Sequence, residues 1–123
     1  MLKQEILGDS DCRGSIVNVV DYGPTASLAD YPTMAAVANA IVGMSKTDAC
    51  DYAQDMIRIN CVAASEVLMR KAKPELQGGV PLPRKGRPDD VSNTVTWLSL
   101  PGSSWLTGLV IPVDGGRSLN HFW

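Results

Sequence analysis

The stretch GSIVNVV at residues 14–20 is mostly apolar and rich in β-branched side chains. Such a run is typical of a strand that is buried on both faces, as in a parallel sheet. Residues 33–53 follow it, are rich in alanine and methionine, and are long enough for a helix of several turns. A second strand candidate, IRINCVA, occupies residues 57–63. Two buried strands joined by a long helix predict a right-handed β-α-β crossover.

The rest of the chain adds one helix and one strand to this arrangement. Arg87-Pro88-Asp89-Asp90 places a proline and two acids where a helix begins, and Pro101-Gly102 ends that helix. Residues 109–113 form a third strand candidate, in which Pro112 indicates a sheet edge. We therefore expect a single truncated α/β domain over residues 1–123, with a Rossmann-like three-layer fold of three parallel strands and flanking helices. Something must cover the free side of its first strand.

Composition narrows the classes of function. The 123 residues carry a formal net charge of −2, which gives no general reason to expect nucleic acid or an anionic membrane as a partner. The three cysteines are widely spaced without a Cys-x-x-Cys motif, which fits free thiols in a reducing compartment. A single histidine argues against a zinc site, and no apolar run approaches the length of a membrane span. We expect a cytoplasmic protein without a metal.

Several segments, in this order, resemble the second half of the short-chain dehydrogenase/reductase family. They are Arg13-Gly14-Ser15-Ile16-Val17-Asn18-Val19, Ile41-Val42-Gly43, Ile57-Arg58-Ile59-Asn60, Gly86-Arg87-Pro88-Asp89-Asp90-Val91, Leu106-Thr107-Gly108 and Val113-Asp114-Gly115-Gly116. Each segment is weak alone, but together and in register they span most of the chain, from residue 13 to residue 116. The resemblance implies a Rossmann-like fold, in which family members use a nicotinamide cofactor, a catalytic tyrosine, a lysine four residues later and a serine thirteen residues earlier.

The family's catalytic positions are replaced in this chain. Counting back from Ile41-Val42-Gly43, the tyrosine position holds Met34, the lysine position Ala38 and the serine position Asp21. A thioether cannot exchange a proton and alanine carries no charge, so the proton relay of hydride transfer is lost. A carboxylate at residue 21 would repel a developing alkoxide instead of stabilising it.

The cofactor positions are replaced as well. The family's Pro-Gly pair and the threonine that faces the nicotinamide fall at Ala64-Ser65 and Met69. The glycine-rich turn that holds the pyrophosphate would precede residue 1. The resemblance therefore implies a degenerate active site, and we expect no cofactor and no NAD(P)-dependent oxidoreductase activity.

The first functional hypothesis is a cofactor-free, non-redox enzyme of secondary metabolism, acting as an isomerase, cyclase or dehydratase on a small apolar metabolite. Asp21 would be its general acid or base, because it follows a buried strand at the end where α/β sheets bind ligands. Tyr22 and Tyr31 would be its proton donors, and Met34, Ala38 and Met69 would line the substrate pocket. A turn role for Asp21 in Asp21-Tyr22-Gly23-Pro24 is at least equally supported.

The alternative hypothesis is a non-catalytic pseudoenzyme. A half-fold exposes its first strand and an apolar helix face, and such a surface favours self-association. On this hypothesis the chain forms a homodimer, or pairs with a full-length dehydrogenase that it stabilises or regulates.

Overall fold

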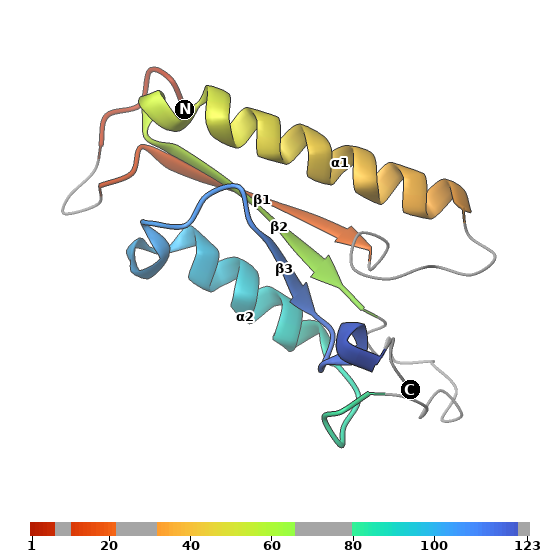
Figure 1. Cartoon of the computed structure of the whole chain (residues 1–123). Helices are drawn as coiled ribbons and strands as arrows, with labels where there is room; N and C mark the ends of the chain where they lie inside the picture. The colour runs from red at the N-terminus through yellow and green to blue at the C-terminus, as the bar shows by residue number, and fades with distance from the viewer. Residues whose placement is uncertain (7–10, 22–31, 66–79, 121–123) are drawn as a thin grey trace.

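The computed structural model describes residues 1–6, 11–21, 32–65 and 80–120. Its main elements, in order along the chain, are β1 (Gly14–Asp21), α1 (Pro32–Asp51), β2 (Ile57–Ala64), α2 (Pro88–Ser99) and β3 (Val110–Val113) (Figure 1). Short 3-10 turns cover η1 (Ala53–Asp55), η2 (Pro101–Ser103) and η3 (Arg117–Asn120). All five main elements lie close to their predicted positions.

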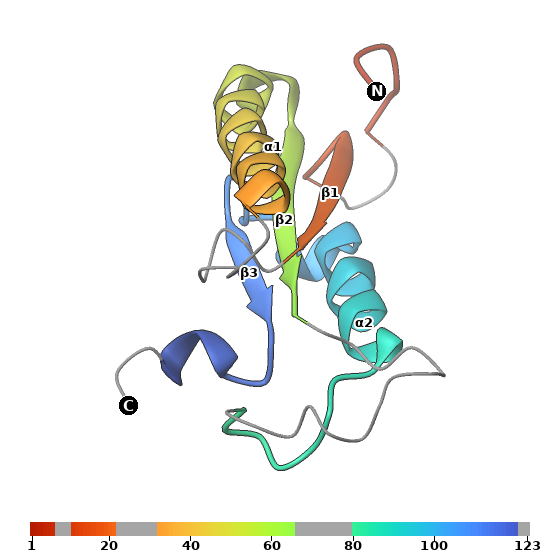
Figure 2. The ribbon, with the colours of Figure 1, turned by 90° about the vertical axis from the view of Figure 1, so that its right-hand side faces the viewer.

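The strands form one parallel sheet in the order β1-β2-β3. Helix α1 packs on β1 and β2, and α2 packs against the same sheet from the opposite face (Figure 2). This arrangement confirms the truncated Rossmann-like three-layer fold. In the part of the chain that the structure describes, the sheet ends at β3, the strand that contains Pro112, as the proline predicts. Among the described residues, no helix is long and apolar enough to cross a membrane.

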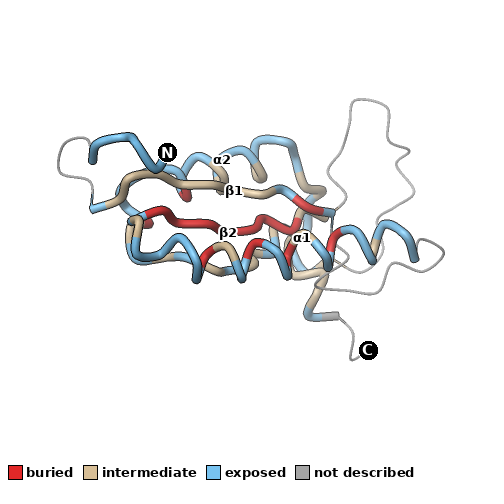
Figure 3. Tube along the Cα trace, turned by 90° about the horizontal axis from the view of Figure 1, so that it is seen from above, coloured by how far each residue is buried: buried red, intermediate tan, exposed pale blue. Residues whose placement is uncertain are grey.

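Strand β2 forms the centre of the core. Residues 57–63 are all buried, whereas most of β1 is only half-buried (Figure 3). On the α1 side, Ala49 packs with Ile57 and Ile59 near the amino end of the sheet. Nearer the carboxyl end, Val42 and Ala38 pack with Cys61 and other buried side chains. The small side chains of α1 allow the helix to approach the sheet closely.

Buried polar side chains of β2 hold the connection that leads into β3. Asn60, which is fully buried, donates from Nδ2 to the Leu106 carbonyl (2.9 Å) and accepts from the Leu109 backbone N–H (3.1 Å). The Thr107 hydroxyl oxygen accepts from the Ile59 backbone N–H (3.1 Å). Because a buried amide without partners would be costly, these bonds fix the path of the loop beside β2.

At the C-terminal end of α2, a free backbone carbonyl accepts hydrogen bonds from side chains of β1, β2 and η2. This Leu98 carbonyl accepts from the Arg58 guanidinium (2.8 Å), the Ser15 hydroxyl (2.9 Å) and the Ser103 hydroxyl (3.0 Å). Free carbonyls at a helix C-terminus need such partners, and a cation there also interacts favourably with the helix dipole. The polar residues of β1 and β2 therefore fix the position of α2 beneath the sheet.

The N-terminal end of α2 is closed by an acidic side chain, as its sequence predicts. Asp90 accepts from the Arg87 backbone N–H (2.8 Å) and from two guanidinium nitrogens of Arg84 (2.7 and 2.8 Å). The hydrogen bonds from Arg84 and from the Arg87 backbone lower the pKa of the Asp90 carboxyl to about 2. The Gly-Arg-Pro-acid-acid motif is thus a helix start whose second acid caps the first turn.

Candidate active site

The carboxyl ends of the strands meet at one edge of the sheet. The strand register places Asp21 beside Ala64, and Ala64 beside Val113. Helix α1 runs antiparallel to the strands, so its first turn begins at the same edge (Figures 1 and 2). Ligands of open α/β sheets bind outside this edge, and the candidate site is therefore built here.

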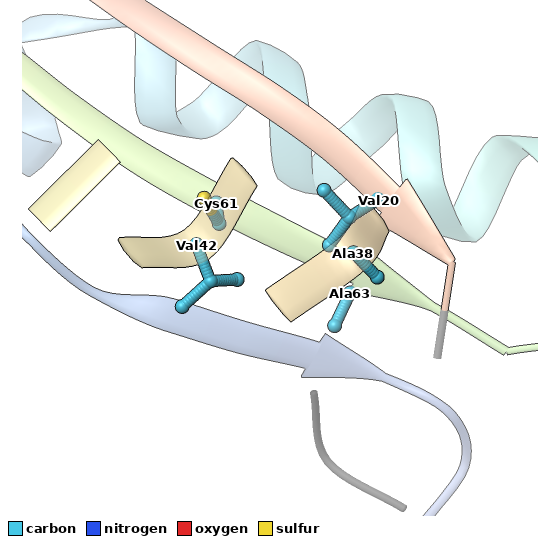
Figure 4. Packing of buried hydrophobic residues seen from close by; sticks show 5 residues of the cluster. All are labelled: Val20, Ala38, Val42, Cys61 and Ala63. Carbon is cyan, nitrogen blue, oxygen red and sulfur yellow. The ribbon is translucent and has the colours of Figure 1, made fainter. Parts of the chain in front are cut away.

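Ala38 lies inside the core behind this edge. Its side chain is 3% exposed and belongs to the cluster of Val20, Val42, Cys61 and Ala63 (Figure 4). A lysine at this position would have to extend past Val20 and Ala63 to reach solvent. The methyl group of alanine instead fills the contact between α1 and the sheet.

Met34 and Asp21 lie at the rim of this edge and are both exposed. Met34 is 46% exposed in the first turn of α1, and Asp21 is the last residue of β1. The structure therefore brings three of the predicted site residues to the same end of the molecule, with only Ala38 in the packed interior. Tyr22, Tyr31 and Met69 lie outside the described residues, and their roles stay predictions.

A polar contact behind the site ties α1 to β1. Asn18 donates from Nδ2 to the Ser45 hydroxyl oxygen (2.7 Å), and that hydroxyl donates to the Ile41 carbonyl (2.7 Å). Neither side chain stood out as functional in the sequence. A signal was available, since Asn18 interrupts an apolar strand and Ser45 shares a helical row with Ala38. Together they position α1, whose first turn lies at the carboxyl edge of the sheet.

Comparisons with known proteins confirm the family resemblance that the sequence indicates. A family model described as enoyl-(acyl carrier protein) reductase matches residues 3–118. The chain belongs to the short-chain dehydrogenase/reductase family. It is 36% identical over 119 residues to a chloroplastic tropinone reductase homolog of Arabidopsis thaliana, spanning 89% of this chain and 37% of that protein. It is also 36% identical over 111 residues to a 3-oxoacyl-[acyl-carrier-protein] reductase of Thermotoga maritima, spanning 85% of this chain and 45% of that protein.

Solved structures give the same result. An acetoin dehydrogenase from Enterobacter cloacae superposes with a TM-score of 0.80 at 28% identity, covering 89% of this chain and 44% of that chain. The chain therefore spans less than half the length of these three relatives.

These matches correct the functional predictions. The proteins that the chain resembles are named as reductases and dehydrogenases, and none of those cited is named as an isomerase, cyclase or dehydratase. The prediction of a cofactor-free, non-redox enzyme is therefore wrong, and so is the statement that the chain is no NAD(P)-dependent oxidoreductase. The alternative of a non-catalytic pseudoenzyme finds no support either, nor does the assignment to secondary metabolism.

The wrong prediction of function came from giving too much weight to the replaced catalytic positions, Met34 and Ala38. Met34 and Ala38 were assigned by counting back along α1 from Gly43, which assumes no insertion in the first turns. Tyr31 stands three residues before Met34, next to Pro32, where α1 begins. A three-residue insertion near the helix start would align Tyr31 with the family tyrosine. The fold-building positions carry the family relationship in either alignment.

Proposed function

We propose that this chain forms the C-terminal, substrate-side half of an NAD(P)-dependent oxidoreductase that acts on a small carbonyl or hydroxyl compound. The observation that carries the proposal is the family match over residues 3–118, on a parallel sheet whose strands end together at one edge. The relatives named above support the redox class. None of them fixes the substrate of this chain, since a shared fold hosts many chemistries.

The described residues do not fit a nicotinamide dinucleotide by themselves. The family holds the cofactor ribose with a lysine four residues after its tyrosine. That position is Ala38 when counted from Met34 and Ala35 when counted from Tyr31, so it carries no charge in either alignment. Ala64-Ser65 stands where the family has Pro-Gly, and the described helices follow no glycine-rich turn of the G-x-G-x-x-G type. On this proposal the cofactor, which supplies the hydride, is bound mainly by the part of the oxidoreductase that this chain does not span.

The proton donor that we propose is Tyr31. A carbonyl that accepts hydride needs a proton from a positioned group, and a phenol hydroxyl can donate one. Tyr31 immediately precedes α1, whose first turn begins at the carboxyl edge of the sheet. Asp21 ends β1 at that edge, where its carboxylate would accept a hydrogen bond from a hydroxyl or ammonium group of the substrate.

A fusion protein tests the proposal. The N-terminal part of the Thermotoga maritima reductase would be joined ahead of the whole chain, and NADPH oxidation would be followed with a panel of small ketones and aldehydes. We expect carbonyl-dependent turnover, and a fall in kcat of about 100- to 10,000-fold in Tyr31→Phe, because the general acid is removed.

Tyr52→Phe is the matched control, since Tyr52 follows α1 at the opposite end of the helix from the site. Its kcat should equal that of the unmodified fusion. A fusion that binds NADPH without reducing any carbonyl would contradict the proposed function. Full activity in Tyr31→Phe would remove Tyr31 from the mechanism.

We further propose a cytoplasmic location and a homo-oligomeric assembly. Cys12, Cys50 and Cys61 form no disulfide with one another, as is usual in a reducing compartment. The Arabidopsis relative named above is described as chloroplastic, so cell fractionation with an antibody against the chain is the appropriate measurement. Recovery in an organelle fraction would contradict the cytoplasmic assignment.

A further inference from the structure

The turn that follows β3 lies beside the segment that leads into α2. Residues 114–117 are called the β3 turn below, and residues 80–84 are called the returning segment. The Leu82 backbone N–H donates to the Gly115 carbonyl (3.1 Å), which joins the two. Because the β3 turn directly follows the carboxyl end of β3, this contact lies at the edge of the sheet where the candidate site is built (Figures 1 and 2).

The end of β3 also holds the start of the connection between β2 and α2. The Ser65 backbone N–H, directly after β2, donates to the Val113 carbonyl (3.2 Å). Residues 66–79, between Ser65 and the returning segment, lie outside the described part of the chain. The end of β3 and the β3 turn therefore fix both the place where the connection leaves the sheet and the place to which it returns.

The β3 turn is held in shape by the side chain of Asp114. Its carboxylate oxygens accept from the Gly116 and Ser118 backbone N–H groups, each at 2.8 Å. An aspartate that accepts backbone N–H groups of the residues after it stabilises a turn. The turn thus presents Gly115 and Gly116 to the returning segment in one backbone conformation, with φ of 63° and 88°.

A side chain on either glycine would collide with the returning segment. A Cβ atom on Gly115 would lie 2.7 Å from Cγ1 of Val80, and one on Gly116 would lie 2.9 Å from Cγ of Pro81. Neither neighbour can rotate freely out of the way, because valine is restricted at χ1 and proline is a closed ring. A Cβ at either position would therefore displace the returning segment itself.

The left-handed backbone conformation alone does not explain these glycines. Met56 has a φ of 59° and still carries a long side chain. Gly108, which precedes the opposite end of β3, has a φ of 72°, but a Cβ there would lie 3.7 Å from Cβ of Ala49, an ordinary contact. What distinguishes the two glycines of the β3 turn is the returning segment packed against them.

On its other side the returning segment is tied to α2. The Arg84 guanidinium donates to both carboxylate oxygens of Asp90 (2.7 and 2.8 Å), in the first turn of that helix. The Arg84 backbone N–H also donates to the Leu82 carbonyl (2.8 Å). Because this end is fixed, a displacement at the β3 turn would be transmitted toward residue 80 and the rest of the connection.

We propose that Gly115 and Gly116 are positioning residues of the oxidoreductase. By leaving room for the returning segment, they hold the β2–α2 connection in place at the carboxyl edge, on the substrate side of the site. The proposal rests on the proposed function, because it gives these glycines a role in substrate binding. They act through the connection and do not touch the reacting atoms. An interaction that is lost equally in the ground and transition states raises KM without changing kcat.

Amide hydrogen exchange of the whole chain tests the contact without any activity. The Leu82 amide reports on it, because it donates to the Gly115 carbonyl. We expect Gly115→Ala to speed exchange of this amide by about a hundredfold, because it adds both a collision and left-handed strain. In the Val80→Ala background the same substitution should speed exchange only about tenfold, because only the strain remains. The nearest atom to the new methyl group is then Cβ of Leu82, at 3.6 Å.

Gly108→Ala is the matched control. It adds the same methyl group at a left-handed position near the other end of β3, where only an ordinary contact is met. Exchange of the Leu82 amide should stay unchanged in this variant, and circular dichroism would verify that each protein folds. If Gly115→Ala does not fold, recovery of folding by added Val80→Ala supports the contact. A double variant that also fails to fold contradicts it.

Kinetics of the fusion with the Thermotoga maritima reductase test the positioning role. We expect Gly115→Ala to raise KM for a reduced carbonyl compound by about tenfold and to keep kcat within about twofold. Adding Val80→Ala should restore most of the KM, and Gly108→Ala should change neither constant. A loss of folded protein alone would instead lower the apparent kcat and leave KM unchanged.

Two results would overturn the proposal: equal acceleration of Leu82 exchange by Gly115→Ala with and without Val80→Ala, or an unchanged KM in an active Gly115→Ala fusion. Failure of the proposed function gives a different pattern. A fusion that reduces no carbonyl, in a chain whose Leu82 exchange still shows the dependence on Val80, would leave the contact intact and remove its role in substrate binding.

Discussion

The two edges of the sheet are built differently. Strand β3 has only four residues and contains the exposed Pro112, which lacks a backbone N–H donor. Strand β1 has eight residues, with no proline and no charge before its last position. A short strand with proline is a typical way to end a sheet, whereas a long apolar edge favours a further strand. The difference indicates that the sheet stops at β3 and continues beyond β1.

Strand β2 lies between the two edge strands, and we expect a substitution in it to have the largest effect. Asn60→Ala removes both hydrogen bonds to the loop before β3, so the Leu109 backbone N–H loses this acceptor and the Leu106 carbonyl keeps only its bond from Arg58. We expect it to lower the free energy of unfolding of the chain by about 3 kcal/mol, with the loss greatest around β3. Urea denaturation followed by circular dichroism measures this change.

Asn39→Ala is the control for that experiment, because Asn39 is exposed on α1 and bonds only locally to the Ala35 carbonyl. Its effect on the free energy of unfolding should stay within about 0.5 kcal/mol. Equal effects of the two substitutions would mean that Asn60 does not hold β3 in place.

A smaller effect on stability is expected from Asp90 at the start of α2, the helix that packs against both edge strands, β1 and β3. The pKa of Asp90 is about 2 in the folded chain, below its ordinary value of 3.8. The folded state therefore favours the ionised carboxyl, and its contribution is complete above pH 3.8 and lost as the pH falls toward 2. Because the pair with Arg84 is exposed, the change in melting temperature over this window should be small and salt-sensitive.

Asp90→Asn has no carboxyl to titrate at that position, so its melting temperature should fall less than that of the unmodified chain between pH 4 and pH 2. Parallel pH curves for the two proteins would show that Asp90 does not stabilise the start of α2.

Much of this fold could be predicted from the sequence, because its elements carry strong local signals. The β-branched runs gave β1 and β2 nearly to the residue, and Pro88 with Asp90 marked the start of α2. The buried row of α1 was only partly predicted. By their three- and four-residue spacing, the sequence places Met34, Ala38, Ile41 and Ser45 on one side of this helix. The structure instead buries Ala38, Val42, Ser45 and Ala49. In a helix so rich in alanine, neighbouring rows differ little in hydrophobicity, so the spacing alone does not select one.

The candidate site was harder to predict for a physical reason. Its residues lie at strand ends and loops, where positions are fixed by counting from a motif and not by periodicity. One insertion before Gly43 moves the tyrosine position from Met34 to Tyr31, without changing which residues build β1, β2 or α1. Scaffold residues such as Asn60 have no such freedom, because their partners lie on adjacent strands and loops.

Amide hydrogen exchange of β1 is the measurement that tests the central claim most directly. It would be recorded for the whole chain alone, and for the chain joined to the N-terminal part of the Thermotoga maritima reductase. The account predicts that residues 14–21 exchange faster than β2 in the chain alone, and that joining slows their exchange by about a hundredfold, while residues 110–113 stay unchanged. Equal exchange of residues 14–21 in both forms would contradict the claim that the sheet continues beyond β1.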